Sequence, residues 1–459
     1  MARLTRGSPR RAAARSLVAS LRHFLTPALW KQARQARGPR RQSRWGLQPL
    51  ALVLLGLTWA CGDSGPERFE TARAFVAACL PKRRRPGKTV SGFQKALARL
   101  PMPVLRVLAA GVRRRVREAL AARWHVEGFV PLGCDGTRLE CPRAAQLERR
   151  LGPAGPSGAA PTLWLTALVH LRLGVPWAWR WGQGTASERD HLRRMLPVLP
   201  AAALLVADAG YVGYDLMRTL LQRRACFLIR MSSKATFYRE GRGRPSRFRD
   251  GVVYYWPPSK KKGESRWAPL RVRLIRVRGR RGQHDVWLAT NVLDRGRLSA
   301  AQAGRFYRWR WESEGLFRTY KRTLAKMKLH SRTVRLVHRE AEGSLLATQL
   351  LLAQGALALP AQATGQAGLP SARKVLLEVR AEIRNVTGMY LGPRQARSYF
   401  ERLAQAQGRQ RRQRSSKVRR RWPGRQDHKP PGPPKILKMG TVLKDKAEKT
   451  LARATACNC

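Results

Sequence analysis

Residues 307–321 read YRWRWESEGLFRTYK, a stretch with helical periodicity. Wound at about 100° per residue, it brings four polar side chains within about 60° of one another. They are Tyr307, Arg310, Glu314 and Lys321. Most of its aromatic and leucine side chains fall on the opposite side, so we expect a helix that buries one face and presents the other. A surface stripe of charge pairs would have the same pattern.

The charge of the chain points to a polyanionic partner. Its 459 residues carry 92 Lys and Arg against 27 Asp and Glu, a formal net charge of +65. A self-repelling charge of this size favours binding to nucleic acid. Coding bias in a GC-rich genome could supply many of the arginines, but it would not remove acids. The few carboxylates are therefore the residues in which to look for chemistry.

The cysteines and the apolar runs suggest a cytosolic protein. Seven cysteines show no regular framework, and the terminal pair Cys457 and Cys459 has no second pair at zinc spacing. We interpret them as reduced thiols with weak metal potential. The basic N-terminus is not followed directly by an apolar run, so no signal peptide is expected. LALVLLGLTWAC (residues 50–61) is too short to span a bilayer and predicts a buried helix.

The two ends of the chain are predicted to differ in order. Residues 1–125 carry apolar positions at helical spacing and are expected to form a small helical domain. This domain could be a plain packing bundle, or its basic helices could recognise DNA ends. Residues 346–407 also have helical patterns. Residues 408–459 form a basic tail that lacks apolar mass and is expected to be disordered when free, where it could add phosphate affinity.

A different pattern begins at residue 126. GFVPLGCDG (residues 128–136) is an apolar run that predicts a strand ending at Asp135. TRLECPR (residues 137–143) could be the returning strand. An Asp-Gly pair is common in turns, so Asp135 could also be a turn residue.

Alternating strand and helix patterns continue through the middle of the chain. Two strands are predicted at 162–171 and 175–182, followed by a helix with Ser187 as N-cap. An apolar strand then ends at Asp208, which could instead cap the next turn, and a helix and another strand follow. This order predicts an α/β domain over residues 126–345.

Residues 232 to about 270 are irregular and very basic, and two strand patterns follow. LRVRLIRVR (residues 270–278) alternates strictly and predicts a half-exposed strand, and HDVWLATNVL (residues 284–293) predicts another. We therefore expect a mostly β insertion at residues 232–290, before the helix that begins near Ser299.

Three acids stand out by their positions. Asp135 and Asp208 are expected at the ends of apolar strands, and Glu314 faces out of the helix described first. Convergent carboxylates in a basic protein predict a site for Mg²⁺ or Mn²⁺, since hard cations take oxygen ligands and phosphodiester chemistry uses two such ions. Nearby acids compete for the assignment: Glu140, Glu188, Asp215 and Glu312.

These motifs resemble those of a known family. The spacing Tyr307-x2-Arg310-x3-Glu314-x6-Lys321 is similar to the Y-R-E-K signature of IS4-type insertion-sequence transposases. CDGTRLECPR (residues 134–143) resembles their first aspartate motif, and VADAGYVGYDL (residues 206–216) resembles the second. The resemblance covers about residues 127–340 and does not extend to the N-terminal helices or the tail.

The resemblance implies a DDE active site on a ribonuclease-H-like fold with a β insertion. Asp135, Asp208 and Glu314 would be the catalytic residues and would bind two Mg²⁺ or Mn²⁺ ions. Tyr307, Arg310 and Lys321 would hold DNA phosphates near the cleaved end. The partners implied are double-stranded DNA, both element ends and target, and a second copy of the chain in a homodimer. The expected location is the bacterial cytoplasm, in association with the nucleoid and not with a membrane.

Trp287 is a further candidate for DNA contact. It lies in WLAT, a setting that resembles the one in which related transposases stack a tryptophan on a base flipped out of the duplex. It could equally be an ordinary aromatic of the β insertion, with Trp256 and Trp267 as the next candidates. For the whole chain, the expected activity is DNA transposition. A metal-dependent nuclease of the same fold and a non-catalytic DNA-binding protein remain as alternatives.

Overall fold

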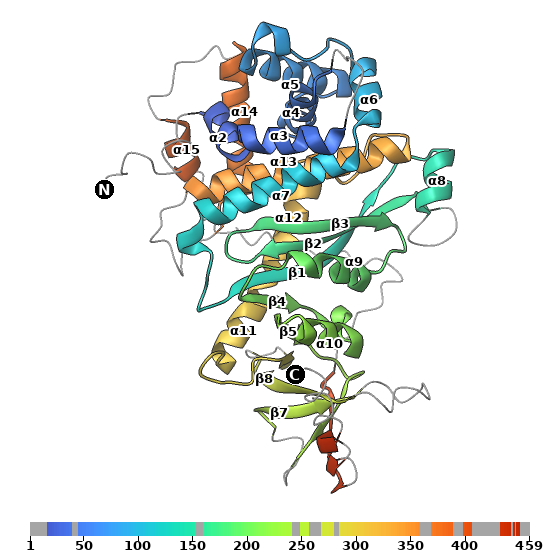
Figure 1. The fold of residues 1–459 in the computed structure, drawn as a ribbon, viewed down its shortest axis with the longest axis vertical. Helices are drawn as coiled ribbons and strands as arrows, with labels where there is room; N and C mark the ends of the chain where they lie inside the picture. Colours follow the sequence, from blue (N-terminus) through green and yellow to red (C-terminus); the bar gives the residue numbers. More distant parts are fainter. Residues whose placement is uncertain are drawn as a thin grey trace, which may run out of the picture. The chain divides into compact units, whose positions relative to one another are not determined.

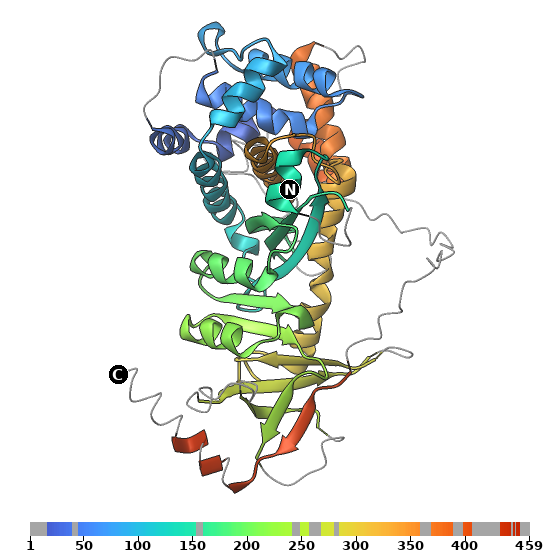
Figure 2. The same ribbon diagram turned by 90° about the vertical axis from the view of Figure 1, so that its right-hand side faces the viewer.

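A computed structural model (Figures 1 and 2) describes most of the chain. The described residues are 16–38, 45–152, 159–240, 248–256, 268–279, 284–358, 369–388, 398–405, 432–441, 444–445 and 447–449. They fall into two compact units. Unit 1 takes its residues from 1–124, 136–186 and 314–410, and unit 2 from 125–135, 187–313 and 411–459.

The N-terminal part of unit 1 is helical, as predicted. Its helices are α2 (Leu17–Phe24), α3 (Pro27–Arg37), α4 (Leu47–Trp59), α5 (Gly65–Cys79), α6 (Val90–Arg99) and α7 (Met102–Ala119). Helix α3 begins sharply because the Thr26 hydroxyl accepts the Leu29 N–H and Pro27 occupies the first helical position. The apolar run predicted to be a buried helix is α4.

Helices from the C-terminal part of the chain complete this core. They are α13 (Val334–Ala358), α14 (Ala372–Thr387) and α15 (Tyr399–Gln405). Helix α13 packs against α4 and α7, and α14 packs against α5 (Figure 1). Because α4 is apolar on all sides, it requires partners all around it. The N-terminal and C-terminal helices therefore share one compact unit, and the domain boundary expected at residue 345 falls inside α13.

Unit 1 also contains a hairpin with a short helix before it. Strands β2 (Thr162–His170) and β3 (Val175–Gln183) pair in antiparallel fashion, as predicted, and turn through Arg172 and Gly174, both with positive φ. Helix α8 (Ala145–Leu151) precedes β2. It was not predicted, because seven residues are too few to show a helical period.

Strand β1 (Val130–Glu140) corrects the prediction for the first aspartate motif. It is one continuous strand, and Asp135 lies in its middle rather than at a strand end or in a turn. The strand continues because Leu139 is fully buried and keeps an inward position beyond the Asp-Gly pair. Residues up to Asp135 belong to unit 2, and Gly136 onwards belongs to unit 1.

Unit 2 contains the predicted alternation of helices and parallel strands. Its elements are α9 (Glu188–Met195), β4 (Ala203–Ala207), α10 (Tyr214–Gln222) and β5 (Cys226–Arg230). Strand β4 pairs in parallel with β1 on one side and with β5 on the other. The Ser187 hydroxyl caps α9 by accepting the Asp190 N–H, as predicted.

The described part of the insertion is made of strands. They are β6 (Thr236–Arg239), β7 (Asp250–Tyr255), β8 (Leu270–Val277) and β9 (Val286–Thr290). The sheet runs in the order β6-β7-β8-β9-β5, so the insertion extends the parallel strands. Strand β10 (Lys435–Lys438) pairs in parallel with β6 (Figure 2). It lies in the segment 408–459 that was expected to be disordered. Within this segment, residues 408–431, 442–443, 446 and 450–459 lie outside the described residues.

Strand β8 is more buried than its alternation predicted. Arg273, expected to be a half-exposed position, is 1% exposed. Its guanidinium donates to both Asp250 carboxylate oxygens at 2.7 and 2.6 Å and to the Leu298 carbonyl at 2.6 Å. A buried guanidinium is stable only with such a full set of acceptors. Its partner, Asp250, lies outside residues 270–278, so their alternating pattern could not predict the burial of Arg273.

The stretch 307–321 is helical, but it is not one regular helix. Helix α11 (Ala300–Trp309) begins at the N-cap Ser299 with a capping box, close to the expected start. Arg310 separates it from α12 (Trp311–Arg318), and Thr319–Thr323 forms a π-helical turn. The π turn is anchored by Tyr320, which is fully buried and shares a 2.6 Å hydrogen bond with Ser344 of α13. The polar face that was predicted for one regular helix is therefore interrupted before Lys321.

No helix within the described ranges is long and apolar enough to cross a membrane.

Gly343 provides a test of the packing in unit 1. A Cβ at this position of α13 would lie 2.3 Å from Leu54 Cδ2 and 2.4 Å from Leu54 Cγ. Gly343→Ala should therefore overpack the contact between α13 and α4 and cost about 1–3 kcal/mol of unfolding free energy. Gly65→Ala is the matched control, because a Cβ there meets nothing within 4 Å. Thermal unfolding of both variants measures the difference, and equal melting temperatures would contradict this packing.

Candidate active site

Two of the three predicted acids lie at the same level of neighbouring strands. The parallel register pairs Gly133 of β1 with Val206 of β4. Asp135 lies two residues further along β1, and Asp208, two residues beyond Val206, directly follows the end of β4, so this register places both acids at the same level within unit 2. This is the edge of a parallel pair at which ligands of α/β sheets commonly bind.

Asp208 also has the local role that its sequence allowed. It follows directly on β4, and its Oδ1 accepts the Gly210 N–H at 2.8 Å. This hydrogen bond caps the 3₁₀ turn Ala209–Tyr211. The interpretation as a turn cap is therefore confirmed, and it fixes the direction of the carboxylate without excluding a second role.

A buried hydrogen bond ties the two aspartate segments together beneath the acids. Cys134 Sγ donates to the Tyr211 hydroxyl at 3.3 Å, and both side chains are 1% exposed. Burial raises the pKa of the Cys134 thiol and the pKa of the Tyr211 phenol, so both stay protonated. Sequence analysis did not single out Tyr211, although its place in the second aspartate motif was a usable signal.

Glu188, a third acid of unit 2, affects the pKa values of Cys134 and Tyr211. Negative charge on Glu188, at the start of α9, contributes to raising the pKa of both Cys134 and Tyr211, after the larger effect of burial. Asp135 acts on the same two groups in the same direction. Glu188 was a competitor in the sequence, and it is the acid to compare with Glu314.

Tyr307 and Arg310 are buried, which differs from the expected exposed face. Tyr307 is 7% exposed and Arg310 6%. The Arg310 guanidinium lies 5.7 Å from the centre of the Tyr307 ring and 4.8 Å from that of Trp311. The Tyr307 hydroxyl is buried, and no residue that the structure describes bonds to it. A buried hydroxyl without a partner is uncommon and suits a ligand that would supply one.

Trp311 is a candidate that the sequence analysis overlooked. It is 59% exposed, an unusual state for the largest side chain, and it carries the Arg310 guanidinium on its ring. The available signal was its angle, about 40° from Tyr307 on the same helical wheel.

Glu314 and Lys321 belong to unit 1, whereas Asp135 and Asp208 belong to unit 2. Both side chains are half-buried. Burial lowers the pKa of the Lys321 ammonium. An anion bound beside Lys321 would reverse this shift, because an opposite charge favours the charged form.

Trp287 is packed inside the insertion. It is 8% exposed, and its ring stacks on Phe248 with centroids 6.2 Å apart. The Arg276 guanidinium lies 5.5 Å from the ring centre. Of the alternatives, Trp256 is half-buried and contacts Tyr238 and Tyr254 through its ring, and Trp267 lies outside the described residues.

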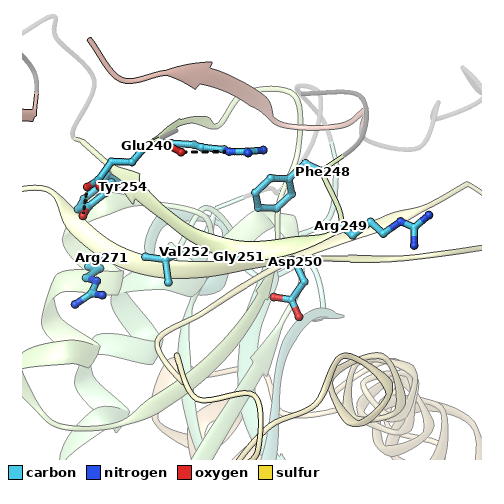
Figure 3. A pocket seen from close by; sticks show the side chains of 9 residues that line it. Glu240, Phe248, Arg249, Asp250, Gly251, Val252, Tyr254 and Arg271 are labelled. Atoms are coloured by element: carbon cyan, nitrogen blue, oxygen red, sulfur yellow. Dashed lines mark hydrogen bonds between the residues drawn. The ribbon is translucent and has the colours of Figure 1, made fainter. Parts of the chain in front are cut away.

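The insertion also contains an open polar cavity of about 480 Å³ (Figure 3). Its acids are engaged: Glu240 accepts the Tyr254 hydroxyl at 2.7 Å, and Asp250 is bound by Arg273. In Figure 3 the Asp250 carboxylate points to the side of the strand away from Phe248. These acids do not converge, so the cavity is a poor candidate for a metal site.

Across the described parts of both units, no three His, Cys, Asp or Glu side chains are grouped to hold a metal ion. The pair Asp135 and Asp208 nevertheless has the donor chemistry that suits Mg²⁺ or Mn²⁺, since both supply carboxylate oxygen from adjacent strands. A complete site would need at least one more acid.

Residues 134–350 match the transposase DDE domain family. The matched segment begins one residue before Asp135, ends inside α13 and includes Asp208 and Glu314. The match supports a DDE transposase.

Comparison with curated proteins gave no match. Among solved structures, one described as the cryo-EM structure of a piggyBac transposase synaptic complex with hairpin DNA is similar over 85% of this chain and 84% of that chain. The TM-score is 0.41 and the sequence identity 11%. Similarity at this level does not establish a shared fold.

Two tyrosines give a matched test of the site. Tyr211→Phe removes a buried hydrogen bond and should lower the unfolding free energy by about 0.5–1.5 kcal/mol. Tyr307→Phe removes a hydroxyl without a partner among the described residues and should be neutral or slightly stabilising. Denaturant unfolding of the two variants measures both effects. A larger loss for Tyr307→Phe than for Tyr211→Phe would overturn this description.

Proposed function

We propose that this chain is a cut-and-paste DNA transposase of the IS4 type. It hydrolyses phosphodiesters at the ends of its element and joins the freed 3′-hydroxyl to target DNA. The observation that carries the proposal is the alignment of Asp135 with Asp208 on adjacent parallel strands, inside a segment that matches transposase DDE domains.

The proposed catalytic residues are Asp135, Asp208 and Glu314. Their carboxylates would hold two Mg²⁺ or Mn²⁺ ions, which supply an activated oxygen nucleophile and stabilise the leaving oxygen. The Asp208 carboxylate is oriented by the Gly210 N–H, and Cys134 and Tyr211 hold the two aspartate segments together. The order of strands and helices from β1 to β5 agrees with the proposed ribonuclease-H-like domain with a β insertion.

The proposed DNA contacts are Tyr307, Arg310 and Lys321. The Tyr307 hydroxyl would donate to a phosphate oxygen, which satisfies a group that otherwise has no partner among the described residues. Lys321 would gain a counter-charge, which offsets the cost of its burial. Duplex DNA is the proposed partner because the net charge of +65 requires a polyanion. A homodimer holding two element ends is the assembly that the family resemblance implies.

Two alternatives remain. A metal-dependent nuclease would use the same acids without joining ends. A non-catalytic DNA-binding protein would use only the basic surface. Purified protein with Mg²⁺ and linear DNA carrying the repeats that flank the gene separates all three. Cleavage with joining indicates a transposase, cleavage alone a nuclease, and binding alone the third class.

The carboxylates are tested by isosteric amides. Asp135→Asn, Asp208→Asn and Glu314→Gln should each lower cleavage by at least about 10³-fold while leaving DNA binding close to that of the native protein, because phosphate contacts do not need the acids. The losses should be non-additive in double variants. Cleavage rates and binding isotherms measured on the same preparations give the answer.

Glu188→Gln is the matched control for these variants, because Glu188 acts on the same Cys134 and Tyr211 groups as Asp135. It should retain most of the cleavage activity. If Glu188→Gln abolishes cleavage and Glu314→Gln does not, the third catalytic acid is Glu188.

Trp287 is proposed to stack on a base extruded from the duplex near the cut. Because its ring is covered by Phe248, binding would require Phe248 to move aside. 2-Aminopurine near the DNA end should brighten on binding the native protein and much less on binding Trp287→Ala. Trp256→Ala and Trp311→Ala are the comparisons. Equal brightening with the native protein and Trp287→Ala would leave Trp287 as a packing residue.

A further inference from the structure

Arg138 makes two contacts within unit 1 although its side chain is exposed. Its guanidinium lies over the Trp164 ring of β2, with Cζ 4.2 Å from the ring centre. Its Nε donates to the carbonyl of Gly184, just beyond β3, at 3.4 Å. All three residues belong to unit 1. An exposed arginine normally samples many rotamers, so this double anchoring reduces its conformational freedom before any ligand arrives.

No carboxylate neutralises this guanidinium within the part of the chain that the structure describes. On the same side of β1, Gly136 has no side chain and Glu140 is paired with Lys328 at 2.8 Å. The contacts of Arg138 are an aromatic face and a backbone carbonyl, neither of which carries a net negative charge. The positive charge is therefore available to an anion from outside the chain.

We propose that Arg138, stacked on Trp164, is a preformed binding site for a backbone phosphate of DNA. Its Nε is already used, and the two terminal nitrogens keep the planar fork that matches two phosphate oxygens. The indole fixes the plane of this fork, so little entropy is lost when the phosphate binds. The proposal rests on the DNA-binding part of the proposed function.

The site serves affinity rather than chemistry. Along β1, strand alternation puts Arg138 on the opposite side from Asp135 and Thr137. The phosphate that it holds is therefore not the one that reacts, but one elsewhere on the bound DNA. Such a contact carries no base information and should act equally on any duplex.

The test measures binding in EDTA, where no cleavage occurs. Fluorescence anisotropy gives the affinity for two short duplexes, one with the flanking repeat and one unrelated, at several salt concentrations. Arg138→Ala should weaken both several-fold and make the salt slope shallower by about 0.9, the value for one phosphate contact. Arg138→Lys should keep the slope and lose part of the affinity. Arg150→Ala is the control, because Arg150 is an exposed arginine of α8 in the same unit.

The contribution of Trp164 is tested by a double-mutant cycle. Trp164→Leu should weaken DNA binding in the native background and have no further effect on binding in the Arg138→Ala background. Melting temperatures identify variants that lose stability, and Trp164→Phe keeps an aromatic face if the leucine variant does not fold.

An unchanged salt slope for Arg138→Ala, an equal change for Arg150→Ala, or strictly additive losses would each overturn the proposal. The last experiment adds inorganic phosphate at matched ionic strength and measures its binding and the binding of DNA. If inorganic phosphate at millimolar concentration binds the native protein but not Arg138→Ala, while both proteins bind DNA equally well, the site is one for small anions and the proposal fails. None of these measurements depends on cleavage. If the Arg138 proposal is wrong, the proposed transposase activity can still be correct, and if that activity is absent, Arg138 can still bind a DNA phosphate.

Discussion

The parallel pairing of β1 with β4 is the constraint on which the candidate site depends. Two buried strands, far apart in sequence, are joined in one register, and that register carries Asp135 and Asp208 to the same level. A slip of one residue would turn every side chain of β1 to the other face, so the pairing is fixed by the apolar residues on both sides of it. Leu132 and Val206 are fully buried. Apolar packing therefore sets the backbone positions of both acids, and the Gly210 N–H further directs the Asp208 carboxylate.

The Cys134–Tyr211 hydrogen bond reinforces this arrangement. Carboxylates on neighbouring strands repel each other, and the repulsion favours separation of the strand ends. A neutral, buried hydrogen bond next to the acids opposes that separation without adding charge. A cysteine and a tyrosine suit the position because burial keeps both protonated.

The elements of this fold could largely be predicted from the sequence, because its helices and strands are long and periodic. α4, the β2–β3 hairpin and the alternation from α9 to β5 have apolar patterns of the right period. β1 could not be read correctly, since Asp-Gly is a local turn signal and only the buried Leu139 shows that the strand continues. The π turn was equally hidden, because it depends on the contact of Tyr320 with Ser344, which lies in a helix further along the chain. Of the candidate acids, Asp208 was placed correctly at a strand end, whereas Asp135 was not, because β1 continues past it. Tyr211 and Trp311 had signals in the sequence, but these became clear only with the structure.

Rarity of acids is a weaker guide to function than the sequence suggested. Several of the few carboxylates are buried or half-buried and serve the fold. Asp250 holds Arg273, Glu342 accepts the Trp181 N–H at 2.8 Å, and Glu340 accepts the backbone N–H groups of His330 and Ser331. A basic chain needs such acids wherever an arginine, an indole or a set of N–H groups would otherwise be buried without an acceptor. What distinguishes Asp135 and Asp208 is therefore not that they are acids in an acid-poor chain. It is that the strand register sets them side by side, where two like charges are costly unless a cation joins them.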